Sequence, residues 1–210
     1  MAKRMGIIVS VSVPWNVNIH YDGTLDALVP PTARSVLDVG CGDGFLAARL
    51  SRRVSDVVAI DVDQPVLDRA RSRFPDVPVT WRHGDVLADV VTPSGGFDAV
   101  VSNAILHHFP DTRIGLRRLS TLVCPGGFLA IVAFARTDWH ELPWASVAFV
   151  ARGVANRVRR KWEHTAPTAW PPADTFGQLR EIAQTELPGA RVSRLIFGRV
   201  LIHWQSPPPQ

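Results

Sequence analysis

Residues 36–45 read V-L-D-V-G-C-G-D-G-F, and the fold class can be inferred from this stretch outward. A short apolar run interrupted by one aspartate is followed by glycines at alternate positions, Gly40, Gly42 and Gly44. From residue 45 to residue 50 the apolar side chains have helical spacing. The pattern therefore predicts a buried strand, a glycine turn and a helix. Such a turn lets the backbone approach a ligand where any Cβ would clash, and the helix N-terminus beyond it favours polar or anionic groups.

Length and composition are those of one large domain, which we expect to span residues 1–210. The chain has 210 residues, of which 46% are hydrophobic and 20% are charged, so it can bury a sizeable core. No apolar stretch is long enough to span a bilayer, and residues 1–9 lack the cleavage site of a signal peptide. Two cysteines make a disulfide framework or a metal site unexpected. We therefore expect a cytoplasmic protein without a bound metal.

Downstream of the glycine turn, strand-like apolar runs alternate with helically spaced segments. Further strands are expected at residues 54–60, 77–81, 97–101 and 128–134. Helices are expected at residues 22–29, with Asp22 as the cap, and at 64–74 and 116–123. This alternation predicts an α/β protein with a doubly wound, mostly parallel sheet and helices on both faces. The last two runs, 190–197 and 199–204, are joined at Gly198 and must form an antiparallel hairpin, which completes seven strands.

The motif D-x-G-x-G-x-G, which begins at Asp38, differs in spacing from the dinucleotide fingerprint G-x-G-x-x-G. It resembles the first motif of the class I S-adenosylmethionine-dependent methyltransferases, whose Rossmann-like seven-stranded sheet also ends in an antiparallel hairpin. The resemblance implies that the glycines make room for the methionine part of the cofactor, and that Asp38 helps to hold its amino group. Cys41 lies inside this turn and is expected to be a small packing residue there, not a nucleophile.

Two acidic residues follow the second expected strand. A carboxylate at Asp61 can accept hydrogen bonds from both hydroxyls of a ribose, a feature that nucleotide and S-adenosylmethionine folds share. Asp63 competes for this role, but its position favours the N-cap of the helix that begins at residue 64. After the third strand the chain reads H-G-D-V from residue 83. The resemblance implies an adenine site here, with the acid bonding the adenine amino group, and its residues are Gly84, Asp85 and Val86, with Val62 on the other face of the ring.

The segment 97–109, F-D-A-V-V-S-N-A-I-L-H-H-F, resembles the fourth-strand motif of the small-molecule methyltransferases. By that resemblance the methionine end of the cofactor is lined by Ser102, Asn103 and Ala104. Ligands in sheets of this kind bind at the carboxyl edge of the strands. Three motifs in this order at that edge are more specific than any one of them.

Methyl transfer from a sulfonium is an in-line displacement, so the protein mainly aligns the nucleophile with the methyl carbon and the sulfur. A general base is needed only when the acceptor must lose a proton. The candidates are His107, His108, His20 and Tyr21, and packing or capping at a helix start is the alternative for the adjacent pair of histidines. In related enzymes the N-terminal segment, here residues 1–30, folds over the cofactor. Tyr21 could there bond the methionine carboxylate, with plain packing as the alternative.

Residues 136–172 hold four of the seven tryptophans and lie between the fifth strand and the last helix. Class I enzymes often place a substrate cap at this point, and large aromatic side chains suit an apolar or aromatic acceptor. Apolar positions recur at helical spacing from residue 147 to residue 162, opposite several arginines. Two alternatives to the cap remain open: a helix with a buried stripe and a solvated basic face, and a helix that touches a membrane surface through residues 144–162.

The sequence thus predicts a methyltransferase that uses S-adenosylmethionine and acts on a small apolar or aromatic molecule. The acceptor atom is expected to be oxygen or carbon, with nitrogen less favoured. An RNA methyltransferase is favoured by the basic isoelectric point, but the chain lacks an RNA-reading motif. A nicotinamide-dependent oxidoreductase is opposed by the glycine spacing and by the hairpin. A non-catalytic protein that binds S-adenosylmethionine remains open, as does the oligomeric state, and no nucleic-acid partner is expected.

Overall fold

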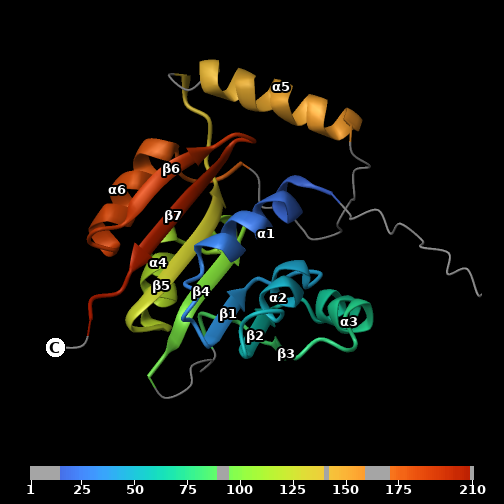
Figure 1. Cartoon of the computed structure of the whole chain (residues 1–210). Coiled ribbons are helices and arrows are strands. Elements are labelled where there is room, and N and C mark those ends of the chain that lie inside the picture. Colours follow the sequence, from blue (N-terminus) through green and yellow to red (C-terminus); the bar gives the residue numbers. More distant parts are fainter. Residues whose placement is uncertain (1–14, 89–94, 140–141, 159–170, 209–210) are drawn as a thin grey trace, which may run out of the picture.

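Seven strands form one sheet in the order β3-β2-β1-β4-β5-β7-β6 (Figure 1). The computed structural model describes residues 15–88, 95–139, 142–158 and 171–208. Its strands are β1 (Ser35–Val39), β2 (Asp56–Asp61), β3 (Val79–His83), β4 (Phe97–Asn103), β5 (Val123–Phe134), β6 (Arg191–Leu195) and β7 (Arg199–Gln205). Its helices are α1 (Val17–Leu28), α2 (Phe45–Leu50), α3 (Gln64–Arg73), the 3-10 turn η1 (Leu106–His108), α4 (Thr112–Thr121), α5 (Leu142–Val158) and α6 (Phe176–Glu186).

The strand directions confirm the predicted architecture. Strands β1 to β5 pair in parallel, whereas β7 is antiparallel to both β5 and β6. The hairpin forms because only a tight turn at Gly198, with a φ of 72°, separates β6 from β7. The carboxyl ends of the parallel strands therefore lie at one edge of the sheet, next to the start of β7.

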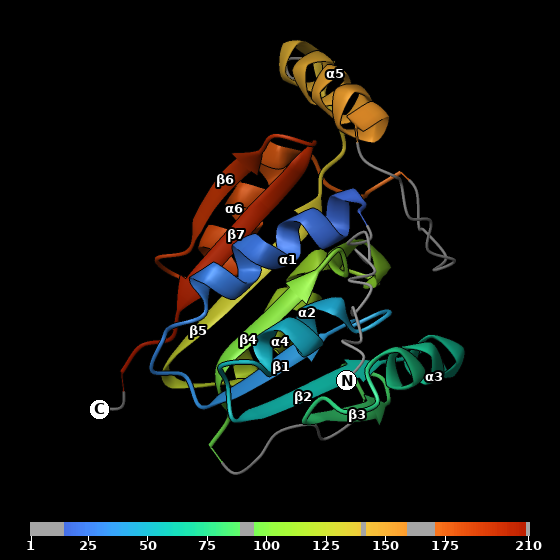
Figure 2. The same cartoon turned by 45° about the vertical axis from the view of Figure 1, so that its right-hand side comes forward.

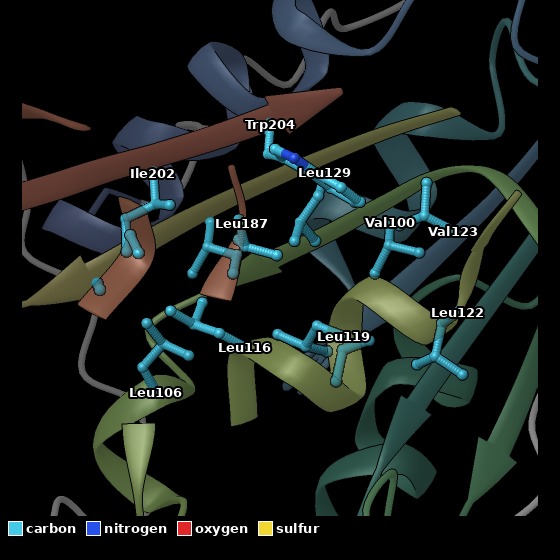
Figure 3. Close-up of a cluster of buried hydrophobic side chains, with 14 of the residues drawn as sticks. Val100, Leu106, Leu116, Leu119, Leu122, Val123, Leu129, Leu187, Ile202 and Trp204 are labelled. Atoms are coloured by element: carbon cyan, nitrogen blue, oxygen red, sulfur yellow. The ribbon is translucent and has the colours of Figure 1, made fainter. Parts of the chain in front are cut away.

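Helices cover both faces of the sheet (Figure 2). Side chains alternate along β1, so that Leu37 and Val39 join one buried cluster and Val36 joins the other. The first cluster lies under α4 and α6 (Figure 3) and includes Leu116 and Leu119, both fully buried. The second lies under α1 and α2. Burial of each such leucine contributes about 1.5–3 kcal/mol, so these two layers hold the sheet edge in place.

The first helix begins earlier than predicted, and Asp22 is not its cap. Asn16 is the N-cap, because its side-chain oxygen accepts a hydrogen bond from the Ile19 N–H at 2.8 Å. Asp22 instead lies inside α1, where it is buried. Asn and Asp are both favoured at helix N-caps, so the local sequence pattern did not show whether Asn16 or Asp22 begins the helix.

The helix predicted at 116–123 was misplaced at both ends. It begins after Asp111, whose side chain accepts a hydrogen bond from the Arg113 N–H at 2.6 Å. It ends at Thr121, because Val123 already pairs with Phe97 in the sheet. The pairing of β5 with β4 overrides the local helical spacing of these residues.

Helix α5 stands at one end of the molecule, beyond the hairpin (Figure 1). The interpretation as a helix with a buried stripe is wrong for its described part, because Val147, Val150 and Val154 are 51%, 63% and 57% exposed. Ala148 of this helix is buried, and its Cβ lies 3.8 Å from the position that a Cβ at Gly198 would occupy. Trp162, the last position of the predicted stripe, lies outside the described residues. Within the described ranges, none of the helices is long and apolar enough to cross a membrane.

Candidate functional site

A cavity of about 870 Å³ lies at the carboxyl edge of β1, β2 and β4. The glycine turn forms part of its wall, and all three glycines have positive φ, which L side chains rarely adopt. A Cβ at Gly42 would meet no atom within 4 Å, and Gly42 lines the cavity. A Cβ at Gly40 would lie 2.8 Å from the Ile105 side chain, and one at Gly44 would lie 2.5 Å from Trp81. The turn therefore opens toward a ligand at Gly42, whereas Gly44 serves packing.

Asp61 joins the end of β2 to the glycine turn. Its Oδ2 accepts a hydrogen bond from the Gly42 N–H at 2.8 Å, and its Oδ1 accepts one from the Asp63 N–H at 3.0 Å. A carboxylate has about four acceptor positions, so lone pairs remain for a ligand on a side chain that lines the cavity. Asp63 caps α3 by accepting from the Val66 N–H, as predicted.

Asp38 is a buried carboxylate in the cavity wall. It is 2% exposed, and its Oδ2 has no hydrogen-bond partner. Burial raises the pKa of this carboxyl well above its usual value, and the nearby charges of Asp22 and Asp61 raise the pKa further. A buried acceptor without a partner is costly, so this geometry fits a cationic donor such as an ammonium group in the cavity.

The predictions did not include Asp22 as a site residue. Asn103 donates from Nδ2 to the Asp22 Oδ1 at 2.8 Å and to the Asn18 backbone oxygen at 2.8 Å. Burial raises the pKa of Asp22 to about 7, although the Asn103 hydrogen bond acts in the opposite direction. Asn18 and Asp22 both line the cavity. Their spacing of four along α1, which places both on one helix face, is the signal that could have identified them.

The proposed adenine end has the expected residues around it. Val62, Gly84, Asp85 and Val86 all line the cavity. Val86 is buried, Val62 is 64% exposed, and the Gly84 N–H donates to the Asp61 backbone oxygen at 3.0 Å. Asp85 Oδ1 accepts from the Leu87 N–H at 2.9 Å, and its side chain is exposed. Two apolar side chains with an acid among the lining residues can contact a flat heterocycle.

Aromatic rings line another part of the cavity. The rings of His107 and His108 are 4.0 Å apart, and His107 meets the Phe134 ring edge-on at 4.7 Å. Burial lowers the pKa of His107 to about 4, with smaller contributions from the charges of His108 and Arg199. His107 is therefore neutral at neutral pH, and its buried Nδ1 has no partner. A neutral imidazole in this position can accept a proton from an acceptor molecule, although its lowered pKa makes it a weaker base than a free imidazole.

Cys41 and Ala104 also line the cavity, but four predicted residues do not: His20, Tyr21, Gly44 and Ser102. The Ser102 hydroxyl donates to the Val39 backbone oxygen at 2.9 Å and so joins β4 to β1. The Tyr21 hydroxyl accepts from the Phe197 N–H at 3.1 Å. The exposed His20 ring packs on the rings of Tyr21 and Phe197 at 4.9 and 5.0 Å. Packing, the alternative considered for Tyr21, is thus what the structure shows.

Comparisons with known proteins agree with this geometry. Residues 37–131 match the methyltransferase domain family. An uncharacterized methyltransferase of Mycobacterium tuberculosis is 54% identical over 194 residues, which cover 92% of this chain and 98% of the relative. A ubiquinone biosynthesis O-methyltransferase of Xanthomonas axonopodis pv. citri is 35% identical over 159 residues, which cover 74% of this chain and 64% of that protein.

A solved structure has the same fold. The magnesium protoporphyrin IX methyltransferase from Synechocystis PCC 6803, crystallised with bound SAH, aligns with a TM-score of 0.60 and 15% identity. The alignment covers 90% of this chain and 84% of that one. The glycine turn, the sheet order and these similarities lead to one conclusion. The chain belongs to the class I S-adenosylmethionine-dependent methyltransferases.

Proposed function

We propose that this protein transfers a methyl group to an oxygen or carbon of a small apolar or aromatic molecule, bound at the aromatic part of the cavity. S-adenosylmethionine is the methyl donor. The observation that carries the proposal is that the cavity wall contains both acidic and aromatic side chains. Asp22, Asp38 and Asp61 line the acidic part, beside α1, β1 and β2, and the rings of His107 and Phe134 line the aromatic part, beside η1 and β5. A cationic cofactor suits the acidic part, and an apolar acceptor suits the aromatic part.

The residues of the acidic part fit the groups of this cofactor. Asp38 has an acceptor without a partner for the ammonium of the methionine moiety, and Asp61 has lone pairs for the ribose hydroxyls. Val62 and Val86 both line the cavity and are proposed to contact the adenine ring, with Asp85 bonding its amino group. The cavity volume of about 870 Å³ lies in the upper part of the usual range for ligand sites, which leaves room for an acceptor beside the cofactor.

The bound cofactor supplies a methyl group already activated on a sulfonium. The work of the chain is then to align the acceptor atom and to exclude water. Asn103 holds α1 against β4 by its two hydrogen bonds, which closes one side of the cavity. His107 is proposed to take the proton of a hydroxyl acceptor, because it lines the cavity and its imidazole is neutral at neutral pH.

The substrate class is supported by two of the relatives. One is named ubiquinone biosynthesis O-methyltransferase, and another is named magnesium protoporphyrin IX methyltransferase. Both names point to small-molecule methyl acceptors. Together with the rings of His107, Phe109 and Phe134 in the cavity wall, they favour oxygen of an aromatic or apolar molecule as the acceptor.

We further propose that residues 1–210 act as one domain in which residues 1–30 cover the cofactor and residues 136–172 form the acceptor cap. Five residues of the N-terminal segment, Asn16 to Ile19 and Asp22, line the cavity and support the first part. In α5, Phe149 and Val150 are 69% and 63% exposed, which suits either an apolar acceptor or a membrane surface. Co-sedimentation with anionic liposomes at low salt separates the two, since absence of binding excludes membrane contact through residues 144–162.

The test of the proposed function is a transfer assay with a radiolabelled methyl group on the cofactor. Acceptors are phenols, aromatic acids, isoprenoid quinols and a structured RNA, and the Asp61→Ala variant is the control. Label in a small-molecule product that depends on Asp61 supports the proposal. Label transferred to RNA alone would contradict it.

A further inference from the structure

Arg199 is a buried cation in the cavity wall, and the proposed methyl transfer assigns no role to it. It is the first residue of β7 and pairs with Phe134 at the end of β5. The residue is 8% exposed, and its guanidinium carbon lies 3.7 Å from the centroid of the Phe134 ring. One terminal nitrogen, Nη2, donates to the Asn18 Oδ1 at 3.2 Å. The aromatic face and one neutral acceptor thus hold the side chain where it lines the cavity.

The charge of Arg199 is not compensated by an acid. Among the described residues, no carboxylate lies within salt-bridge distance of its guanidinium. Its Nε is buried and has no hydrogen-bond partner. Burial lowers the pKa of Arg199 to about 10, so the group remains protonated at neutral pH. A buried, unpaired charge is costly, and an anion in the cavity would offset that cost.

The position of Arg199 decides which anion this is. In the sheet, β7 lies three strands from β1 and four from β2, which carry Asp38 and Asp61. Strands are spaced by about 4.8 Å, so the Arg199 backbone lies roughly 14 Å along the sheet from the β1 backbone, while its guanidinium reaches toward α1 and donates to Asn18. The guanidinium packs on the ring of Phe134, and its charge acts on His107. Because these two rings line the part of the cavity proposed for the acceptor, an anion at Arg199 is assigned to the acceptor.

We propose that Arg199 binds a carboxylate of the methyl acceptor, so that the substrate is an aromatic or apolar carboxylic acid. The inference rests on the proposed function, because it assigns a group to the acceptor of that reaction. Guanidinium binds carboxylate through a fork of two N–H groups, and Arg199 uses a single N–H for Asn18 among the described residues. Phe134 and His107 then contact the apolar body of the same molecule.

The experiment uses the full chain saturated with S-adenosylhomocysteine and titrates it with benzoate and, separately, with the neutral analogue benzamide. Three variants are compared: Arg199→Met, which removes the charge at similar volume, Arg199→Lys, which keeps the charge without the fork, and Arg52→Met, an exposed arginine outside the cavity wall as control. We expect benzoate to bind the wild type more tightly than benzamide does. Arg199→Met should weaken benzoate binding by about tenfold, Arg199→Lys by less, and Arg52→Met not at all.

The affinity for S-adenosylhomocysteine separates the possible failures. If the wild type does not bind it, the proposed function fails. If it binds the wild type but is weakened in a folded Arg199→Met variant, the anion is the carboxylate of the cofactor and this inference is overturned. Equal benzoate affinity in the wild type and Arg199→Met, or no preference over benzamide, also overturns it. If Arg199→Met does not fold, Arg199→Lys decides, since unchanged benzoate affinity there contradicts the carboxylate fork.

Discussion

Asn103 donates its side-chain amide to the Asp22 carboxylate at 2.8 Å, and this hydrogen bond joins the carboxyl end of β4 to the middle of α1. The two residues are 81 positions apart in the chain. Asp22 is 7% exposed and lines the cavity, so the hydrogen bond lies where the N-terminal helix covers the proposed cofactor site. The electrostatics of this carboxyl give the first prediction.

The stability of the ligand-free protein should fall with rising pH because of Asp22. Its pKa is raised from 3.8 to about 7 in the folded state, mainly by burial. The folded state thus favours the protonated form, so this stabilising contribution is complete below pH 3.8 and is lost as pH rises through about 7. The Asp22→Asn variant should be more stable than the wild type above neutral pH, by up to about 4 kcal/mol. Denaturant unfolding of both proteins across this pH range tests it, and parallel pH profiles would contradict it.

Asp38 should contribute to cofactor affinity more than to folding. Its unpartnered Oδ2 is proposed to accept from the cofactor ammonium, and loss of a charged hydrogen bond costs about 1.5–3 kcal/mol. Asp38→Asn should therefore weaken binding of S-adenosylhomocysteine by roughly tenfold or more. The same change removes a carboxyl whose charged form burial disfavours, so the melting temperature without ligand should not fall. Calorimetric titration and thermal unfolding measure the two effects, and an unchanged affinity would exclude the proposed contact.

Two glycines of the turn should respond differently to alanine. Gly42 and Gly44 both have positive φ, of 53° and 81°, so each substitution costs about 1–2 kcal/mol in backbone strain. A Cβ at Gly44 would also lie 2.5 Å from the Trp81 ring, whereas one at Gly42 would project into open space. Gly44→Ala should therefore lower the melting temperature more, and Gly42→Ala should lower cofactor affinity more. The reverse order would contradict the division of roles within the turn.

His107→Gln should lower turnover and leave cofactor affinity unchanged. General base catalysis contributes about a hundredfold or more, so a loss of that size in kcat is expected with a hydroxyl acceptor. The pKa of His107 is lowered from 6.5 to about 4, so its protonation should reduce the rate near pH 4 and not near pH 6.5. His203→Gln, on β7 beside Phe128, is the matched control. Unchanged turnover in His107→Gln would leave packing as the role of this residue.

Local sequence patterns were enough for the parts of the fold that local interactions determine. The segment from β1 through the glycine turn to α2 follows from three glycines that require positive φ. The hairpin follows from the short link at Gly198, and the cap of α3 from Asp63. In each case the deciding residues are neighbours in the chain, so spacing predicts the structure directly.

The missed parts depend on contacts between distant segments. Arg199 is one arginine among many in the sequence, and it becomes a buried cation in the cavity only because β7 pairs with β5. The sequence pattern suggested Asp22 as a helix cap. In the structure Asn16 is the cap, and Asp22 lies where α1 packs against β4. The apolar stripe of α5 has the same helical spacing whether it is covered or exposed, so the spacing could not predict which of the two occurs. Burial of a charged or apolar side chain depends on the partner, which the local pattern does not contain.

Calorimetric titration of the purified protein with S-adenosylhomocysteine and with NAD, in parallel with the Asp61→Ala variant, tests the proposed cofactor site. The proposed ribose ligand is Asp61, whose carboxylate already accepts from the Gly42 and Asp63 backbone N–H groups at 2.8 and 3.0 Å. This contact predicts a dissociation constant for S-adenosylhomocysteine on the order of micromolar, at least about tenfold weaker in a folded Asp61→Ala variant, and no binding of NAD. Equal affinity of wild type and variant, or binding of NAD in place of S-adenosylhomocysteine, would contradict it.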